Sequence, residues 1–519
     1  MRFFKTVFLD LISEFRWSYL PPLMVYTAAG VAGLTGIVGT FFIKEYLNLS
    51  ATFLAALSFW IGIPWALKMP VGHLVDLIWK RKNLLVFFGA FLITISLLIM
   101  FGLVAHTKAM AEYLNIETWF IISALLSPIG YMIQDVVADA MTVEAVPSID
   151  QFGKKLPEPE VKKMHTTMQM LGRFAIIGGT IIVAIINVIV FKDIKNLKEI
   201  EIIDLYSKVY LSALIIPLIS VLGVLLASKL KVNFSNDNQS TKPNWWILIG
   251  SFIFVIFTLF VGLMKFKFSE EIVFIGSMII VIFLMKKLLE QLKIEARRMV
   301  IGTAIIIFVF RAMPNPGPGI TWFEIDILGF DQQFISLLTL ISSVLTIVGI
   351  IFLRPFMFNN SIAKIIVLLT VIGSVLFLPT VGFYYGFHLW TASITGGVVD
   401  ARFIAVINTA IESPLGQVAM IPLLAWIAKN SPDHLKATYF AVFASFTNLA
   451  LSASALGTKY LNQIFTVTRE VKDKITNKIV STQDYSELGF ILLSVLFISF
   501  LVPLITVSII QKSKIKTFE

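Results

Sequence analysis

Apolar stretches of about 20 residues recur along the whole chain and are separated by short polar loops. Such a stretch forms a helix long enough to cross a bilayer, because each residue adds about 1.5 Å and the hydrocarbon core is about 30 Å thick. Inside lipid every backbone N–H and C=O must be hydrogen-bonded within the protein, which a helix achieves by itself. We therefore expect an all-α, polytopic membrane protein.

The composition agrees with this interpretation and excludes soluble and fibrous classes. Of 519 residues, 57% are hydrophobic and 14% are charged, against about 25% charged in an ordinary soluble domain. The net charge of +10 comes from Lys and Arg spread through short loops, where it sets orientation in the membrane and does not indicate binding to nucleic acid. We expect the partners to be the lipid bilayer and a small-molecule substrate, and the protein to be a monomer.

Several kinds of chemistry have no motif in this chain. It has no cysteine, so disulfides, thiolate metal sites and cysteine nucleophiles are excluded. The five histidines show no metal-ligand spacing, and we find neither a P-loop nor a G-x-S-x-G motif. We expect no metal, no cofactor and no enzymatic activity.

The apolar runs predict about 14 spanning helices. They fall at residues 20–44, 51–75, 84–104, 117–145, 166–191, 207–228, 244–264, 270–290, 299–323, 331–355, 361–385, 398–428, 433–462 and 486–510.

Threading these helices alternately through the membrane places most basic residues of the short loops on one side. By the positive-inside rule that side is cytoplasmic, which puts both termini in the cytoplasm. We expect the protein to lie in the cell's inner (plasma) membrane. Residues 1–19 are amphipathic and charged, without a short apolar core before a cleavage site. We expect them to form a helix on the cytoplasmic face of the membrane and not a signal peptide.

The spans divide into groups around a polar loop at 229–243. We expect one six-helix bundle over 20–228, a central loop with an inserted helix pair over 229–298, and a second six-helix bundle with a basic tail over 299–519. This layout resembles a major facilitator transporter with two inserted helices, in which the site lies between the two bundles near the middle of the membrane.

The span 117–145 carries three carboxylates, Asp135, Asp139 and Glu144. A carboxylate near the middle of such a helix costs roughly 2.5–3.5 kcal/mol, so it is usually kept where it lines a water-filled path or meets a cation. Asp135 and Asp139 share one helical face with Tyr131, whereas Glu144 points elsewhere, near the inner boundary. The pattern indicates a transporter with this helix beside its pathway.

Two basic residues, Lys68 and Arg173, fall at about the same depth as Asp135 and Asp139. A neutralised cluster of two acids and two bases is therefore expected. Its role has two interpretations. One is a structural ion-pair network that closes an inner gate, and the other is direct binding of substrate or a proton; both hold if a gate pair exchanges partners.

The second bundle offers Arg311 and Glu412 near the middle of the membrane. Three prolines follow Arg311 within 314–318, and they cannot continue an α-helix. Either the helix is broken inside the membrane, which points to a transport site, or it ends in an outer loop. Likewise, Arg311 and Glu412 are either substrate-binding groups or a buried ion pair without substrate contact.

The loop from Gly72 to Lys82 resembles the loop signature of the major facilitator superfamily. In that signature an aspartate, here Asp76, follows a glycine by four residues, and a basic pair that includes Arg81 comes later. Trp79 stands where the signature usually has a glycine. The other interpretation is a basic loop that only fixes the orientation. As a gating motif, the loop makes Asp76 and Arg81 gate candidates.

Three stretches resemble the folate–biopterin transporter family of the major facilitator superfamily. They are the run Ile63–Pro70 before the Gly72 loop, the acidic helix with Asp135, Asp139 and Glu144, and the segment from Ile421 to Asn448. Met69 replaces a common family proline. The resemblance covers both bundles and leaves the inserted pair unmatched. It implies proton-coupled transport of a pteridine-containing or similar organic anion, and makes Lys68, Asp135, Asp139, Arg173 and Asp400 candidate site residues.

We therefore expect a secondary active transporter of a small organic anion, pterin- or folate-like by resemblance, that couples to protons and works by alternating access. Arg311 and Arg173 would attract the anion, and Asp135, Asp139 or Glu412 would take up the proton. The alternative is a facilitator-type exporter or permease for peptidoglycan fragments, drugs or lipids. A lipid-modifying enzyme and a non-transporting receptor are the remaining classes.

Overall fold

The computed structural model describes residues 15–517 with gaps. These are 67, 79–80, 147–155, 231–244, 246–248, 250–252, 254–255, 259, 263–265, 291–292, 354–355, 358–359, 417, 419–435 and 473–477. Residues 1–14 of the expected N-terminal helix, much of the expected span 244–264 and the end of the span 398–428 lie outside the described residues.

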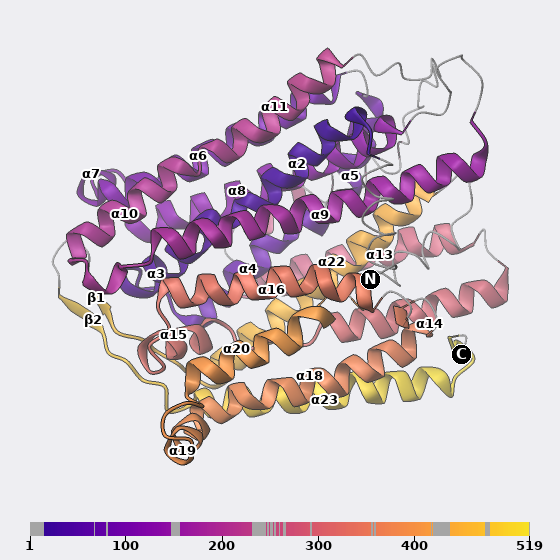
Figure 1. Ribbon diagram of the computed structural model, residues 1–519. Coiled ribbons are helices and arrows are strands. Elements are labelled where there is room, and N and C mark those ends of the chain that lie inside the picture. The colour runs from indigo at the N-terminus through magenta and orange to yellow at the C-terminus, as the bar shows by residue number, and fades with distance from the viewer. Residues whose placement is uncertain are drawn as a thin grey trace, which may run out of the picture. The chain divides into compact units, whose positions relative to one another are not determined.

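The described chain is almost entirely helical (Figure 1), which confirms the all-α membrane architecture. Eight helical stretches in it are long and apolar enough to cross a bilayer, and the total of 14 stays a prediction. They are Trp17–Tyr46, Asn83–Ala105, Ile116–Thr142, Leu171–Asn196, Glu199–Lys229, Gln332–Phe352, Ile362–Tyr384 and Leu488–Gln511.

Some expected spans differ from the helices observed. Helix α9, Glu158–Val190, begins eight residues before the predicted start at 166. Its first turns are polar, so hydropathy does not reveal them, but Pro159 near the N-terminus suits a helix start. The span 207–228 consists of two helices, α10 (Glu199–Ser212) and α11 (Ile215–Lys229), which meet at a turn just before Pro217.

The chain forms two compact units, and the first contains residues 1–38 and 70–245. In it α2 (Leu20–Val31) packs against α9, α11 and α8 (Ile116–Ala145), and α6 (Asn83–Ala105) packs against α8, α10 and α11. Helix α5 (Lys68–Leu77) and the short helix α7 (Thr107–Ala111) flank α6 in sequence.

Glycines set the close approach of α2 to α9 in this unit. A Cβ placed on Gly30 would lie 2.0 Å from the backbone oxygen of Ile176, and one on Gly179 would lie 2.7 Å from that of Thr27. Real side-chain atoms do not approach so closely, so both positions require glycine at this helix separation. Small residues of this kind are how membrane helices pack tightly without a hydrophobic driving force.

The second unit contains residues 39–69 and 246–519. Here α4 (Ala51–Ala66) packs along α22 (Lys436–Ile464), and α13 (Ser269–Leu289) packs against α22 and α4. The end of the first span, α3 (Gly36–Tyr46), thus leads the chain into this unit. The sequence-based division into bundles at 20–228 and 299–519 stays a prediction.

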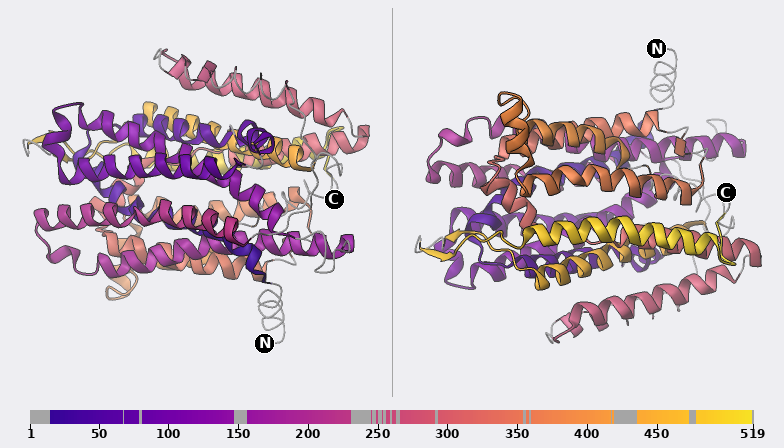
Figure 2. Two further views of the ribbon diagram at one scale, coloured as in Figure 1. Left: turned by 90° about the horizontal axis from the view of Figure 1, so that it is seen from above. Right: turned by 90° about the horizontal axis from the view of Figure 1, so that it is seen from below.

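The longer of the remaining helices of the second unit run roughly parallel or antiparallel to each other (Figures 1 and 2). Helix α14 (Ile294–Arg311) packs against α22 and α23 (Leu488–Gln511), and α18 (Ile362–Tyr384) packs against α23. Helix α16 (Gln332–Phe352) packs against α20 (Ala401–Glu412). The strands β1 (Val471–Lys472) and β2 (Ile479–Ser481) pair in an antiparallel hairpin.

A buried arginine holds residues 43–49 within the second unit. The Arg469 guanidinium donates hydrogen bonds of 2.6–2.9 Å to the backbone oxygens of Ile43, Lys44, Leu47 and Leu49. Burial lowers the pKa of Arg469 to about 10, so the group remains charged at neutral pH. It therefore caps the C-terminal end of α3, where carbonyl groups lack helical partners.

The same region has two further contacts around the short helix α15 (Pro318–Asp326). The guanidinium of Arg469 lies 3.9 Å from the ring centre of Trp322, and Lys44 forms an ion pair with Asp326. Tyr485 donates a 2.6 Å hydrogen bond to the same carboxylate. These contacts tie α3, α15 and the loop after α22 together.

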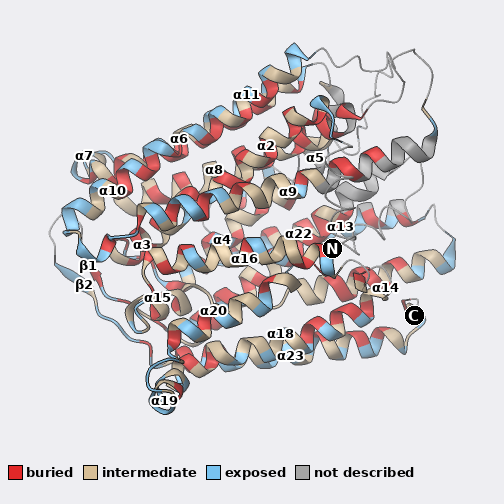
Figure 3. Cartoon of the chain, in the orientation of Figure 1, coloured by how far each residue is buried: buried red, intermediate tan, exposed pale blue. Residues whose placement is uncertain are grey.

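Burial along the helices fits a lipid-facing exterior (Figure 3). On α23, Phe490, Phe497 and Ile509 are more than half exposed, whereas Leu488, Ile491 and Leu492 are fully buried. Large exposed apolar side chains on a helix of high mean hydropathy are expected where the surrounding medium is hydrocarbon.

Candidate functional site

The acidic helix α8 contacts the first span through a hydrogen bond between side chains. Tyr26 on α2 donates its hydroxyl to Asp139 Oδ1 at 2.6 Å. This distance is typical of a charge-assisted O–H···O⁻ bond. Tyr26 is only 6% exposed, so the hydroxyl and the carboxylate meet inside the first unit and not at its surface.

Two of the other predicted charged residues lie close to this pair. Asp135 lies one helical turn before Asp139 on α8, and Arg173 follows Gly172, against which the Tyr26 ring packs. Asp135 is half-buried on α8 and Arg173 is exposed on α9. The first unit therefore brings Asp135, Asp139 and Arg173 near one tyrosine, whereas a neutralised cluster of these three residues with Lys68 stays a prediction. We call Tyr26, Asp135, Asp139 and Arg173 the charged cluster.

Glycine makes room for the tyrosine in this cluster. A Cβ on Gly172, next to Arg173, would lie 2.9 Å from Tyr26 Cε2. The Tyr26 ring thus packs directly on the α9 backbone, with Val25 and Ala138 as buried neighbours. The cluster is held by helix packing and is not an isolated surface ion pair.

The remaining predicted residues of the first bundle are placed as follows. Tyr131 is half-buried on α8, Lys68 is half-buried at the start of α5, and Arg81 is exposed in the turn before α6. Asp76 belongs to α5 and Glu144 to α8, but their side chains lie outside the described part of the chain. Roles for these residues stay predictions.

In the second unit, Arg311 is the last residue of α14 and is half-buried. The helix stops there, and α15 begins at Pro318, so the predicted helix 299–323 is interrupted at the prolines. Gly317, with φ of 78°, has a left-handed backbone conformation that glycine adopts without strain.

Side chains of α22 satisfy the backbone groups freed by this interruption. Ser454 donates to the Met313 oxygen at 2.6 Å, and Asn462 donates to the Pro316 oxygen at 3.2 Å. Thr458 accepts a 3.0 Å hydrogen bond from the Asn315 N–H. A break within the membrane requires such partners.

Glu412 and Asp400 lie at opposite ends of α20. Glu412 is the last residue of the helix and is exposed. Its Oε2 atom accepts a hydrogen bond from Asn408 Nδ2 at 3.5 Å. Asp400 is the exposed N-cap residue, whose side chain accepts a 2.8 Å hydrogen bond from the Phe403 N–H. This contact gives Asp400 a structural role as a helix cap, and a part in transport stays a prediction.

Sequence reasoning missed several residues that these contacts involve. Tyr26 is one aromatic residue among many in apolar spans, and nothing in its neighbourhood distinguishes it. The small polar residues of α22, among them Thr458 and Asn462, follow each other at helical spacing on one face, which could have indicated a polar contact with another helix.

Solved structures of known transporters have the same fold. The chain aligns with a POT family transporter in complex with 5-aminolevulinic acid, with a TM-score of 0.63, 14% identity and coverage of 96% of both chains. It aligns with the nucleoside transporter NupG with a TM-score of 0.53 and 13% identity, over 96% of this chain and 100% of NupG. The protein is thus a multi-pass membrane protein with the major facilitator fold.

The sequence itself identifies the family. Residues 29–517 match the model of the BT1 family, so the chain belongs to that family. A similar curated protein is the folate-biopterin transporter of Synechocystis sp. (strain ATCC 27184 / PCC 6803 / Kazusa). It is 23% identical over 445 residues, which cover 84% of this chain and 72% of the relative. The protein is a transporter and not an enzyme, as the sequence predicted.

Proposed function

We propose that this protein is a proton-coupled secondary active transporter of a small organic anion of the pterin or folate type. It would work by alternating access between the two predicted bundles, with both termini in the cytoplasm. The family and the Synechocystis folate-biopterin transporter support the substrate class. The half-buried carboxylates Asp135 and Asp139 within an apolar span support the proton coupling, because proton relays in transporters use such groups.

The Tyr26–Asp139 hydrogen bond is the observation that carries this proposal. It links α2 to α8 at the level where Asp135 and Arg173 also lie. Protonation of Asp139 would replace a charge-assisted bond by a weaker neutral one. Protonation would thus weaken the contact between α2 and α8 in the charged cluster. In this way proton binding would be coupled to helix movement.

The charged residues then have distinct roles. Arg173, with Arg311 from the second bundle, would attract the carboxylates of a folate-like anion, because a guanidinium binds a carboxylate through two parallel hydrogen bonds. Asp135 would accept hydrogen bonds from the adjacent N–H donors of a pterin ring. Asp139 or Glu412 would take up the coupling proton.

Uptake into proteoliposomes tests this function. We expect the purified protein to accumulate radiolabelled folic acid or biopterin when the pH outside is lower than inside, and not in the absence of the gradient. Asp139→Asn cannot carry the proton and should lose gradient-driven accumulation, while exchange of labelled for unlabelled substrate continues. Arg173→Gln should lose both, because it weakens binding of the anion.

The control is Lys208→Met, which removes an exposed ion pair with Asp204 on α10 and should leave uptake unchanged. Full gradient-driven accumulation by Asp139→Asn would refute its role as proton carrier. Transport of peptidoglycan fragments, drugs or lipids in place of pterins and folates would assign the protein to the alternative class of exporters and permeases.

A further inference from the structure

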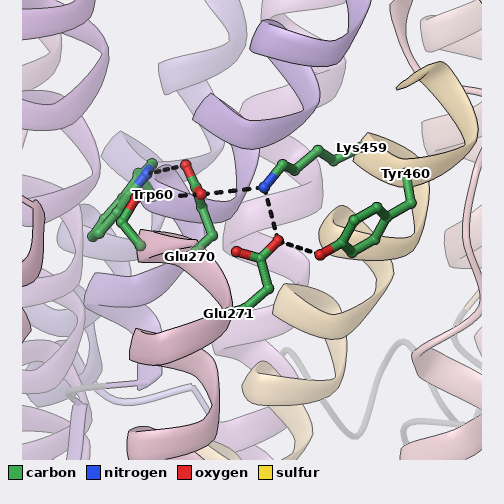
Figure 4. Close-up of polar contacts among 6 residues, drawn as sticks. Trp60, Glu270, Glu271, Lys459 and Tyr460 are labelled. Atoms are coloured by element: carbon green, nitrogen blue, oxygen red, sulfur yellow. Dashed lines mark hydrogen bonds and ion pairs between the residues drawn. The ribbon is translucent and has the colours of Figure 1, made fainter. Parts of the chain in front are cut away.

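The helix α13 belongs to the inserted pair and joins α4 and α22 through a polar cluster at its first turn (Figure 4). Glu270 accepts hydrogen bonds from Trp60 Nε1 at 3.1 Å and from Lys459 Nζ at 3.2 Å. Glu271 accepts from Lys459 Nζ at 2.8 Å and from the Tyr460 hydroxyl at 2.6 Å. We call these five residues the latch cluster.

An apolar core lies directly beside the latch cluster. Phe59 and Ile63 from α4, Val273 from α13 and Leu456 from α22 are buried together. The ring of Trp60 packs on Gly262, whose added Cβ would lie 3.3 Å from it. The start of α13 is therefore fixed to both helices by apolar packing and by polar bonds.

The charges of the latch cluster are not balanced, so its hydrogen bonds are sensitive to the loss of a partner. Lys459 is only 7% exposed and contacts two carboxylates, so the cluster holds one more negative charge than positive. In the described part of the chain, Glu271 Oε2 is buried without a hydrogen-bond partner. A buried polar atom without a partner raises the free energy of the arrangement in which α13 is bonded to α4 and α22.

The direct contact between α4 and α22 combines this apolar packing with neutral hydrogen bonds. Asn448 donates to the Trp65 oxygen at 3.0 Å, and Thr52 donates to the Asn462 oxygen at 2.7 Å. Between them, Gly62 faces Ser452, and its added Cβ would lie 3.8 Å from the Ser452 hydroxyl. Small residues at this position let the two helix backbones lie close together.

We propose that the inserted helix α13 is a reversible latch, which holds α4 against α22 through the latch cluster and releases them once in each transport cycle. This role rests on the alternating-access part of the proposed function. In this proposal the inserted helix pair determines the fraction of time for which α4 and α22 are in contact.

A disulfide between α4 and α22 reports this contact directly. The chain has no cysteine, so the double variant G62C/S452C introduces the only two thiols. A Cβ on Gly62 would lie 3.8 Å from the Ser452 hydroxyl oxygen, so two cysteine side chains at these positions would be close to each other. The rate of disulfide formation under a copper–phenanthroline oxidant then measures how often the two helices are in contact, without any substrate.

Three changes in the latch cluster are tested in this double variant. Lys459→Met removes the shared cation, Trp60→Phe removes one donor to Glu270, and Tyr460→Phe removes one donor to Glu271. We expect disulfide formation to slow several-fold with Lys459→Met and by a smaller factor with the two conservative changes. Lys208→Met, the same change at an exposed ion pair of the first unit, should leave the rate unchanged.

Equal rates in all these variants would overturn the latch. If Lys459→Met does not fold, Trp60→Phe and Tyr460→Phe decide the question alone. A parent double variant that forms no disulfide would contradict the α4–α22 contact on which the latch depends. Because no substrate takes part, failure of the latch is distinguishable from failure of the proposed transport function.

Discussion

At the scale of single residues, the structure shows how charged side chains are kept inside apolar helices. Tyr26 supplies Asp139 with a donor, and backbone oxygens at the end of α3 supply Arg469 with acceptors. A buried charge is tolerated when its hydrogen bonds are complete. Each of these groups should therefore be sensitive to loss of its partners.

We predict that Arg469→Lys destabilises the protein by about 2–4 kcal/mol, because an ammonium group cannot reproduce a planar guanidinium that bonds four carbonyls and stacks on an indole. The measurement is the thermal unfolding midpoint in detergent. Arg402→Lys is the control, since Arg402 forms a partly exposed ion pair with Asp331 and should change stability by less than about 1 kcal/mol. Equal shifts in the two variants would contradict the prediction.

At the scale of helices, close packing depends on which side of a helix a glycine occupies. Gly178 and Gly179 are neighbours on α9, yet an added Cβ would meet nothing within 4 Å at Gly178 and the Thr27 oxygen at 2.7 Å at Gly179. Substituting alanine at these two positions should therefore have different effects on the free energy of unfolding.

We predict that Gly178→Ala is neutral or stabilises α9 by up to about 1 kcal/mol, since alanine is the better helix former. Gly179→Ala should destabilise by about 1–3 kcal/mol, because α2 and α9 must move apart. Thermal unfolding of both variants measures the difference. Similar midpoints for the two would mean that α2 and α9 are farther apart than described.

The interrupted helix at 312–317 gives a second prediction at this scale. Thr458→Val removes the hydroxyl that accepts from the Asn315 N–H and leaves that donor unsatisfied, at a cost of about 1–3 kcal/mol. Thr506→Val on α23 is the matched control, because the Thr506 hydroxyl bonds only to its own helix at Val502. A smaller loss of stability with Thr458→Val than with Thr506→Val would show that the break has other partners.

The sequence predicted the helices well because hydropathy and length determine a span almost by themselves. The rise per residue also placed Asp135, Asp139 and Arg173 at a common depth with Lys68, and the neutralised cluster of these four residues stays a prediction. Tyr26, Lys459 and Arg469 could not be found in this way, since their partners come from helices distant in sequence. Helical spacing says which face a residue occupies and not which helix covers that face.

At the scale of the whole molecule, the main finding is that residues 39–69 pack with the second unit although they come early in the chain. Hydropathy cannot show such an exchange, because it depends on contacts and not on the order of the spans. The predicted cytoplasmic location of both termini is a separate question, which labelling can answer.

We predict that Thr482→Cys, in the exposed loop before α23, reacts with a membrane-impermeant maleimide in intact cells, whereas Lys514→Cys, after α23, reacts only after the cells are opened. The reason is that α23 crosses the bilayer between them. The absence of native cysteine means that the unmodified chain is the control. The opposite labelling pattern would invert the orientation inferred from the basic loops.

The proline interruption has a consequence for movement. Its freed peptide groups are bonded to Ser454, Thr458 and Asn462, all on α22. The segment therefore cannot swing away as an independent hinge without breaking the hydrogen bonds of one backbone amide and two backbone carbonyls. Whatever rearrangement displaces α22 must carry the broken stretch along as part of the same rigid body.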